Sequence, residues 1–341
     1  TTTTTNTIMT QPTVDIVTGA TQGIGKAIAE CIAMERSKNA AFLNKENYLL
    51  VLVGRNEQRG TQVQDLIHKT YNHIPVTFES VDLSDWEDVQ TLEQRIAAQL
   101  GNNKNNNNNN DDYHVGILVN DAAECPKRQQ WAQLKRQTVS GGSSSSSNDV
   151  DPKLVPVDKQ FATNVLGYHF MIKAFQKHYS LTDNNNDNPS SSLFHPTHIV
   201  NVASTWAGSL DLNDVNFERR SYDNDDAYRQ SKQCNRMLSR LWSSQLEGKA
   251  WVNACHPGDP CTTLSKALGY NLFASSPNVK FIRQDSPIPY LCGLDADRGD
   301  VLTTTGEWFV GSGTKPSRCG FAGNTKEAER LFEMCESFSS F

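Results

Sequence analysis

Long apolar runs are missing from this sequence of 341 residues, and the longest, such as YLLVLV at 48–53, are far too short to span a bilayer. No C-x-x-C pair occurs among the eight cysteines, and no Asn-x-Ser/Thr acceptor is present, since Asn188 precedes a proline. No signal-peptide apolar segment is visible. These absences predict a soluble intracellular protein, cytoplasmic or organellar. Because the chain begins at Thr1, an upstream targeting segment is left open.

A strong charge of either sign is also missing. The formal net charge of -6 gives no electrostatic reason to expect a nucleic acid or an anionic membrane as partner. The eight histidines and eight cysteines show no spacing typical of metal ligands, so no metal site is predicted.

What the sequence does contain is a regular alternation of short apolar strands and amphipathic helices. Strands are predicted at 13–20, 48–55, 76–84, 115–121, 197–204 and 249–258, and helices at 23–38, 59–71, 86–100, 157–179 and 226–246. This alternation is typical of βαβ units with helices on both faces of a parallel sheet. It predicts an α/β fold, a Rossmann-type doubly wound parallel sheet of about seven strands.

Three polar inserts interrupt the alternation, at 101–112, 137–151 and 182–192. Asn- and Ser-rich compositions bury too little apolar surface to fold, so these segments are predicted to be surface loops. The alternation resumes after each one. We therefore expect a single domain over 14–341, preceded by a disordered tail at 1–13.

The stretch TGATQGIG, residues 18–25, joins the first predicted strand to the first helix. Gly19 allows a tight turn, Gly23 lets the backbone approach a pyrophosphate, and Gly25 permits close helix–strand packing. The helix N-terminus then faces the phosphates. Residues of this turn expected to contact a dinucleotide are Gly19, Thr21, Gln22, Gly23, Ile24 and Gly25.

The end of the second strand reads VGRN, with Arg55 where an acidic residue would select NAD. A guanidinium can pair with a 2′-phosphate, so Arg55 and the adjacent Asn56 predict NADP (NADPH) as cofactor. Asp82 and Leu83, at the end of the third strand, are expected to contact adenine. A capping role for Asp82 is the alternative.

Residues 227–235, AYRQSKQCN, place Tyr228 four residues before Lys232 in a predicted helix. Helix positions i and i+4 share one face. A phenol titrates at a pKa of about 10 in water, and a neighbouring ammonium lowers that value. The pair therefore predicts either a general acid/base or a solvated helix pair, and the spacing alone leaves both open.

Several motifs occur in one order along the chain: TGATQGIG, VDLSD (81–85), LVNDAA (118–123), FATNVLGYHFM (161–171), HIVNVAS (198–204), AYRQSK (227–232) and HPG (256–258). In this order they resemble the short-chain dehydrogenase/reductase superfamily. The segments 210–228, 256–269 and the C-terminal tail from Gly306 are similar to its retinol-dehydrogenase-like and carbonyl-reductase-like branch.

The resemblance implies a catalytic set of Asn164, Ser204, Tyr228 and Lys232. It implies that Tyr228 exchanges a proton with the substrate, that Ser204 donates to the same oxygen, and that Asn164 positions a water. Lys232 is expected to hold ribose hydroxyls and, with an oxidised nicotinamide, to lower the pKa of Tyr228. Further cofactor contacts implied are Asn120, Ala122, Pro257, Gly258 and Thr262, besides Tyr228 and Lys232.

Two departures from the family pattern stand out. Its Asn-Asn-Ala-Gly is NDAA here, so that Asp121 adds a charge and Ala123 replaces a glycine near the expected cofactor. The family usually places apolar residues before the threonine that contacts the nicotinamide carboxamide, whereas Asp259, Pro260 and Cys261 stand here. The threonine role is assigned to Thr262, and the adjacent Thr263 is the alternative. Cofactor affinity is therefore open.

The prediction for function is an NADP-dependent oxidoreductase that acts on a small-molecule carbonyl/alcohol pair. A lipophilic substrate is expected, because Leu264, Leu268, Leu272, Phe273, Phe281 and Ile282 could form a pocket wall. The alternatives are a dinucleotide-binding sensor or scaffold with little turnover, and a reductase of a pigment or other tetrapyrrole. A homo-oligomer is left open.

Overall fold

The computed structural model describes residues 11–101, 113–137, 153–181, 196–270, 273–295, 302, 304–317 and 325–339. The expected tail as far as residue 10, and the expected surface loops at 102–112, 138–151 and 182–192, lie outside the described residues. Thr13, assigned above to the tail, is the first residue of the first strand.

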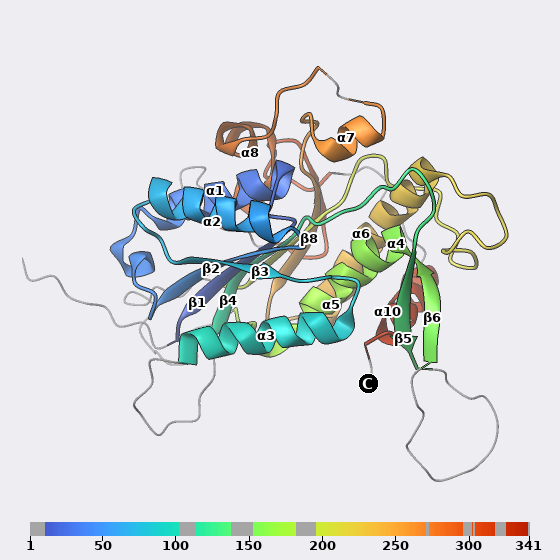
Figure 1. Ribbon diagram of the computed structural model, residues 1–341, viewed down its shortest axis with the longest axis horizontal. Helices are drawn as coiled ribbons and strands as arrows, with labels where there is room; N and C mark the ends of the chain where they lie inside the picture. Colours follow the sequence, from blue (N-terminus) through green and yellow to red (C-terminus); the bar gives the residue numbers. More distant parts are fainter. Residues whose placement is uncertain are drawn as a thin grey trace, which may run out of the picture.

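The described residues form one central sheet of seven strands, and every neighbouring pair is parallel. The strands are β1 (Thr13–Thr18), β2 (Tyr48–Gly54), β3 (Val76–Ser80), β4 (His114–Asn120), β7 (His198–Val202), β8 (Trp251–His256) and β9 (Trp308–Val310). Their order is β3-β2-β1-β4-β7-β8-β9. Figure 1 shows the sheet between α1 and α2 on one side and α3 and α5 on the other. The predicted doubly wound parallel sheet is confirmed. The order reverses between β1 and β4, and ligands bind at such a switch point, outside the carboxyl ends of the strands.

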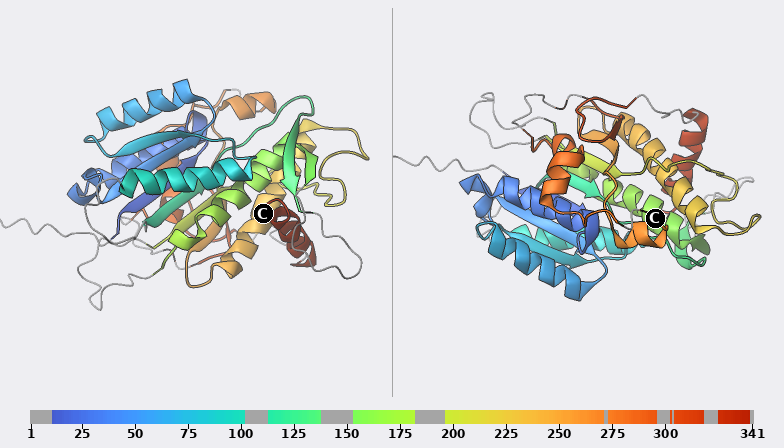
Figure 2. Two further views of the ribbon diagram at one scale, coloured as in Figure 1. Left: turned by 60° about the horizontal axis from the view of Figure 1, so that its bottom comes forward. Right: turned by 90° about the horizontal axis from the view of Figure 1, so that it is seen from above.

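Helices cover both faces of this sheet. One face packs against α1 (Gly23–Arg36), α2 (Glu57–Thr70), α8 (Val279–Asp285) and α9 (Ile288–Leu291). The other packs against α3 (Trp86–Gly101), α5 (Gly167–Ala174), α6 (Asn224–Gln245) and α10 (Thr325–Glu336). The short α4 (Lys159–Phe161) precedes α5 in the second layer, and α7 (Thr263–Ala267) lies in the segment after β8. The C-terminal part of the chain contributes to both faces of the sheet, because α8 packs on α1 and α10 packs on α6 (Figure 2).

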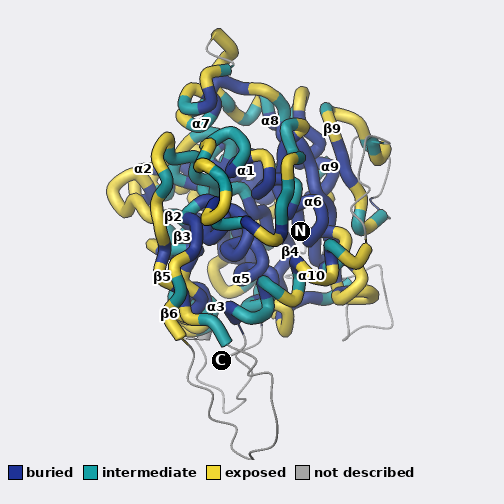
Figure 3. Tube along the Cα trace, turned by 90° about the vertical axis from the view of Figure 1, so that its right-hand side faces the viewer, coloured by how far each residue is buried: buried dark blue, intermediate teal, exposed yellow. Residues whose placement is uncertain are grey.

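The strands are apolar on both faces because both are covered. In β2, Leu49 and Val51 belong to one core cluster, and Leu50 and Leu52 belong to the other. All four are at most 1% exposed. This burial explains why β2 is an unbroken apolar run rather than an alternating one. The buried strands form the dark centre of the molecule in Figure 3.

The predicted helix at 157–179 is wrong at both ends. Residues up to Asp158 belong to β6 (Lys153–Asp158), which pairs with β5 (Trp131–Arg136) in a separate antiparallel ribbon. The Asp158 carboxylate accepts hydrogen bonds from the backbone of Gln160 and Phe161, so the helix begins at Lys159. The helix continues through a π-helical turn at Ala162–Leu166 and ends at Ala174.

Among the described residues, no helix is both long enough and apolar enough to cross a membrane.

Candidate active site

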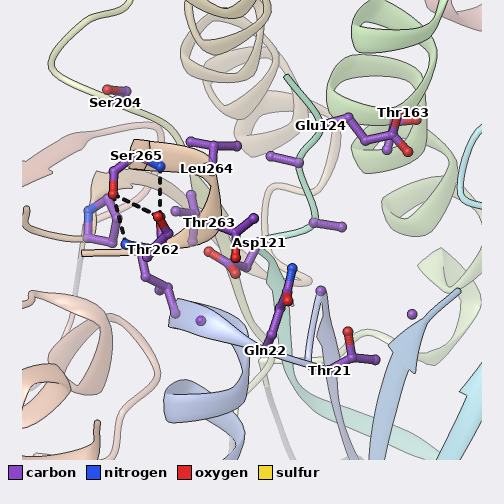
Figure 4. Close-up of a pocket in the computed structure, with 18 of the residues that line it drawn as sticks. Thr21, Gln22, Asp121, Glu124, Thr163, Ser204, Thr262, Thr263, Leu264 and Ser265 are labelled. Carbon is purple, nitrogen blue, oxygen red and sulfur yellow. Dashed lines mark hydrogen bonds between the residues drawn. The ribbon is translucent and has the colours of Figure 1, made fainter. Parts of the chain in front are cut away.

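A cleft of about 510 Å³ opens at the carboxyl ends of the strands. This is the size of a typical small-molecule site. Most predicted site residues line it: Gly19, Thr21, Gln22, Gly23, Ile24, Arg55, Asn56, Leu83, Ala122, Ser204, Tyr228, Lys232, Pro257, Gly258 and Thr262. Segments far apart in the sequence thus meet at one edge of the sheet, as Figure 4 shows for the glycine turn and the start of α7.

The glycine turn has the backbone that a phosphate cradle requires. Gly19 and Gly23 have φ of 71° and 63°, in the left-handed region that favours glycine. A Cβ on Gly25 would lie 2.5 Å from the carbonyl oxygen of Gly19, so that even alanine does not fit there. In contrast, a Cβ on Gly23 would meet only Thr262, at 3.9 Å. The turn is therefore tightly packed behind and open towards the cleft, which fits a bound pyrophosphate.

Tyr228 and Ser204 meet inside the cleft. Helix α6 is capped by Asp223, whose carboxylate accepts from two backbone N–H groups, and this cap sets where its first turn places Tyr228. The Tyr228 side chain is 5% exposed and lines the cleft together with Ser204. Burial raises the pKa of Tyr228 above its ordinary value, and the neighbouring Ser204 hydroxyl acts in the opposite direction.

Lys232 lies one turn further along α6 and is 2% exposed. Its Nζ donates to the carbonyl oxygen of Val202 at 2.8 Å and to the hydroxyl of Tyr168 at 3.3 Å. The same Nζ lies 5.8 Å from the centroid of the Tyr228 ring. Burial lowers the pKa of Lys232, and the nearby Asp121 acts to raise it. In the protein by itself, the ammonium therefore faces a backbone carbonyl, and the pKa of Tyr228 is raised rather than lowered.

Asn164 lies behind the cleft rather than among its lining residues. Its Oδ1 accepts from the backbone N–H of Glu124 at 2.8 Å, and its Nδ2 donates to the Glu124 carbonyl at 3.0 Å and to Ser231 Oγ at 3.2 Å. Asn164 belongs to the π-helical turn, a distortion that often occurs at functional sites. The side chain thereby holds the loop after β4, and the water-positioning role stays a prediction.

Three other predicted residues also lie outside the cleft lining. Asn120 Nδ2 donates to Asn201 Oδ1 at 2.9 Å inside the sheet. Asp82 accepts from the backbone N–H of Ser84 at 3.0 Å and from Ser84 Oγ at 2.7 Å, in the turn before α3. The capping role that was its alternative falls instead to Asp85, whose carboxylate accepts from the backbone N–H of Glu87. Gly25, the third of them, acts through packing.

Asp121, the charged departure from the family pattern, is directed at the glycine turn. A Cβ built on Gly25 would lie 2.8 Å from Asp121 Oδ2, so the carboxylate stands against the turn. Burial raises the pKa of Asp121, against the opposing effects of Lys232 and of the Gly25 backbone. The carboxyl group therefore lies beside the backbone that faces the expected phosphates.

The segment after β8 closes the cleft on one side. Thr262 Oγ1 accepts from the backbone N–H of Ser265 at 3.0 Å and caps α7 (Figure 4). Both Thr262 and Thr263 line the cleft. Of the six apolar residues expected to form a pocket wall, five are described and only Leu264 is a lining residue. Phe273 is fully exposed and Ile282 packs in the core beneath α1.

Two charged residues that the sequence interpretation missed line the mouth of the cleft. Arg59 donates from Nη1 to Gln22 Oε1 at 2.6 Å. Glu124 forms an ion pair with Arg55. Arg59 lies in the first turn of α2, four residues after Arg55. This spacing in the sequence could have indicated a second arginine near the end of β2. Nothing in the sequence pattern indicates the partner of Arg55.

Comparisons with known proteins agree with this geometry. No family model matches the chain. Retinol dehydrogenase 13 of Mus musculus is 28% identical over 267 residues, which cover 76% of this chain and 62% of that protein. The Homo sapiens protein of the same name is 28% identical over 260 residues, 74% of this chain and 61% of that protein. The chain thus spans about three fifths of the length of these curated relatives.

Solved structures share the fold. A short chain dehydrogenase from Salmonella enterica has a TM-score of 0.53 at 18% identity and covers 88% of this chain and 95% of its own. A short chain dehydrogenase from Escherichia coli complexed with NADPH has a TM-score of 0.52 at 19% identity, with 89% and 97% covered. The chain is thus similar in sequence to curated retinol dehydrogenases, and it has the fold of solved short chain dehydrogenases.

Proposed function

We propose that this protein is an NADP-dependent oxidoreductase that acts on a carbonyl/alcohol pair. The observation that carries the proposal is that buried Tyr228, Ser204 and Lys232 line the same cleft as the glycine turn. A bound dinucleotide supplies the hydride, which is chemistry that no side chain offers. The protein supplies binding, orientation and the proton.

The roles of the protein side chains follow from these contacts. In reduction, Tyr228 donates its phenolic proton to the substrate oxygen, and in oxidation it takes the hydroxyl proton back. Ser204 Oγ accepts from the backbone N–H of Trp206 at 3.1 Å, which orients its own proton towards the same oxygen. Lys232 supplies a buried positive charge one turn from the phenol, which favours the phenolate.

NADP is the proposed cofactor because the mouth of the cleft is basic at the end of β2. Arg55 and Arg59 both line it, and no acidic residue occupies 54–56. Two similar structures, from Escherichia coli and Shigella flexneri, carry NADPH and NADP in their descriptions, which supports the same choice here.

A lipophilic substrate remains part of the proposal, supported by Tyr270 and by one of the residues first expected, Leu264. Tyr270 lines the cleft and packs on Trp206, with ring centroids 4.3 Å apart. Leu264 adds an apolar surface to the lining. The name of the curated relative, retinol dehydrogenase, supports an alcohol or aldehyde on an apolar body.

One observation favours a second candidate, a dinucleotide-binding sensor with little turnover. Asp121 lines the cleft against Gly25 and places an acidic group where phosphates are expected. NADPH consumption across a panel of aldehydes and ketones separates the two. Turnover on any of them supports the oxidoreductase, whereas tight binding without turnover on the whole panel supports the sensor.

Replacement of Arg55 tests the choice of cofactor. Arg55→Gln should weaken NADPH binding about 10-fold or more, since a charge-assisted hydrogen bond contributes about 1.5–3 kcal/mol. NADH, which has no 2′-phosphate, should bind almost as before. Dissociation constants for both dinucleotides are the measurement, and Arg219→Gln, an exposed arginine outside the cleft lining, is the matched control. Equal losses for NADPH and NADH would remove Arg55 from phosphate recognition.

A further inference from the structure

The Arg55–Glu124 ion pair crosses the cofactor cleft. Arg55 follows β2 and Glu124 lies in the loop that follows β4, and β1 stands between these two strands in the sheet. Neighbouring strands are about 4.8 Å apart, so the two strand ends are separated by about 10 Å. The side chains bridge this distance over the end of β1, where the glycine turn begins. The pair therefore lies at the end of β2, beside the glycine turn, where a 2′-phosphate is expected.

The two partners are held differently. The backbone of Glu124 is fixed on both sides by Asn164, which accepts from its N–H and donates to its carbonyl. The Glu124 side chain is 14% exposed, whereas that of Arg55 is 52% exposed. Glu124 is thus the anchored end of the pair, and Arg55 is the end that solvent or a ligand can reach.

A 2′-phosphate and the Glu124 carboxylate are both attracted to the same guanidinium. The carboxylate contacts Nη2 of Arg55, so it partly neutralises the positive charge and places a negative charge where the phosphate would approach. Arg59 lies one turn away but donates to Gln22. A ligand without the 2′-phosphate leaves the Arg55–Glu124 pair intact.

We infer that Glu124 is a specificity-determining residue, which competes with the 2′-phosphate of NADP for Arg55 and so reduces the preference for NADP over NAD. This inference rests on the proposed function, because it concerns the same dinucleotide site. It assigns to Glu124 a role that neither its sequence position nor its distance from Tyr228 suggests.

The test is a double-mutant cycle on cofactor binding. Dissociation constants for NADPH and NADH, and for the fragments 2′,5′-ADP and ADP, are measured on the wild type, Glu124→Gln, Arg55→Gln and the double variant. Glu124→Gln should tighten NADPH and 2′,5′-ADP about 3–10-fold, the range expected when a partly exposed competing ion pair is removed. NADH and ADP should change less than about twofold, and the effect of Glu124→Gln should vanish in the Arg55→Gln background.

Controls separate competition from a change in charge or fold. Glu57→Gln removes the same charge from the start of α2, outside the cleft lining. This variant should leave the ratio of the NADPH and NADH dissociation constants unchanged. Glu124→Asp keeps the charge but withdraws the carboxylate by one methylene, so it should shift the ratio in the same direction as Glu124→Gln. It serves as the second variant if Glu124→Gln does not fold.

The possible results have distinct meanings. Equal tightening of NADPH and NADH would overturn the inference in favour of a general charge effect. Weaker NADPH binding in Glu124→Gln would also overturn it, since Glu124 would then orient Arg55 for the phosphate. If the wild type binds NADPH and the ratio does not move, only the inference fails. If the wild type binds neither dinucleotide, the proposed function fails with it.

Discussion

Tyr228→Phe is expected to reduce turnover about 10²–10⁴-fold while NADPH still binds. The substitution keeps the buried ring and removes only the hydroxyl, which is the proposed proton donor. The glycine turn and Arg55 are untouched, so the dissociation constant for NADPH should stay within about threefold of the wild type. Single-turnover rates on a verified substrate, with the binding constant measured separately, test both parts.

Tyr222→Phe is a matched control, because Tyr222 lies outside the cleft lining and its hydroxyl donates to the Pro126 carbonyl instead. It should leave the rate nearly unchanged. A Tyr228→Phe protein that retained near-full activity would remove the phenol from the mechanism, and AYRQSK would then be an ordinary helix pair.

The pH dependence of the same residue gives an independent readout. Burial raises the pKa of Tyr228 in the protein alone, so its tyrosinate absorbance should appear only above the ordinary range. Binding of NADP⁺ brings a positive ring close to the phenol and should lower this pKa. In alcohol oxidation the phenolate is the active form, so kcat/KM should rise with pH. This rise of kcat/KM should be absent in Tyr228→Phe. Difference spectra with and without NADP⁺ that show no shift would contradict the proposed tuning.

Lys232→Met is expected to lower rate and cofactor affinity together. Methionine fills much of the same buried space but removes the donors to Val202 and Tyr168 and the positive charge beside Asp121. The rate should fall about 10²-fold or more, because the phenolate loses its nearest cation. NADPH affinity should fall about 10-fold, because the proposed donor to the ribose is lost.

Thermal unfolding accompanies these measurements, since a buried charge that loses its partner can also destabilise the fold. Lys177→Met serves as control, because that lysine is 64% exposed and pairs with Glu93 on the surface. If Lys232→Met lowered only the stability, with rate and affinity intact in the folded fraction, Lys232 would be structural.

Local patterns were enough to predict the sheet and the core of the site. The unbroken apolar run in β2 can be buried only between two helix layers, and the glycines of TGATQGIG meet positive φ and close contacts that other residues do not allow. Tyr228 and Lys232 share a helix, so their common face follows from spacing alone. Such features depend on neighbours in the sequence.

The start of the helix before Asn164 could not be predicted in this way. Val157 and Asp158 continue a helical pattern, but Val157 pairs with Ala132 in the β5–β6 ribbon and Asp158 caps the helix that follows. Pairing with a distant strand outweighs helix propensity. The lipophilic wall failed for a similar reason, since the fold places Ile282 in the core and Phe273 in solvent.

The sequence by itself determined the parallel sheet, the phosphate turn and the order of the proposed catalytic residues, because each depends on local spacing and backbone geometry. The tertiary structure alone decided the partners of the charged groups. Only the folded sheet places Glu124 against Arg55. Only burial in the folded protein raises the pKa of Tyr228, and only the folded protein brings the ammonium of Lys232 to the carbonyl oxygen of Val202. Charge pairing and desolvation depend on which distant segments are brought together, and a linear pattern does not contain that information.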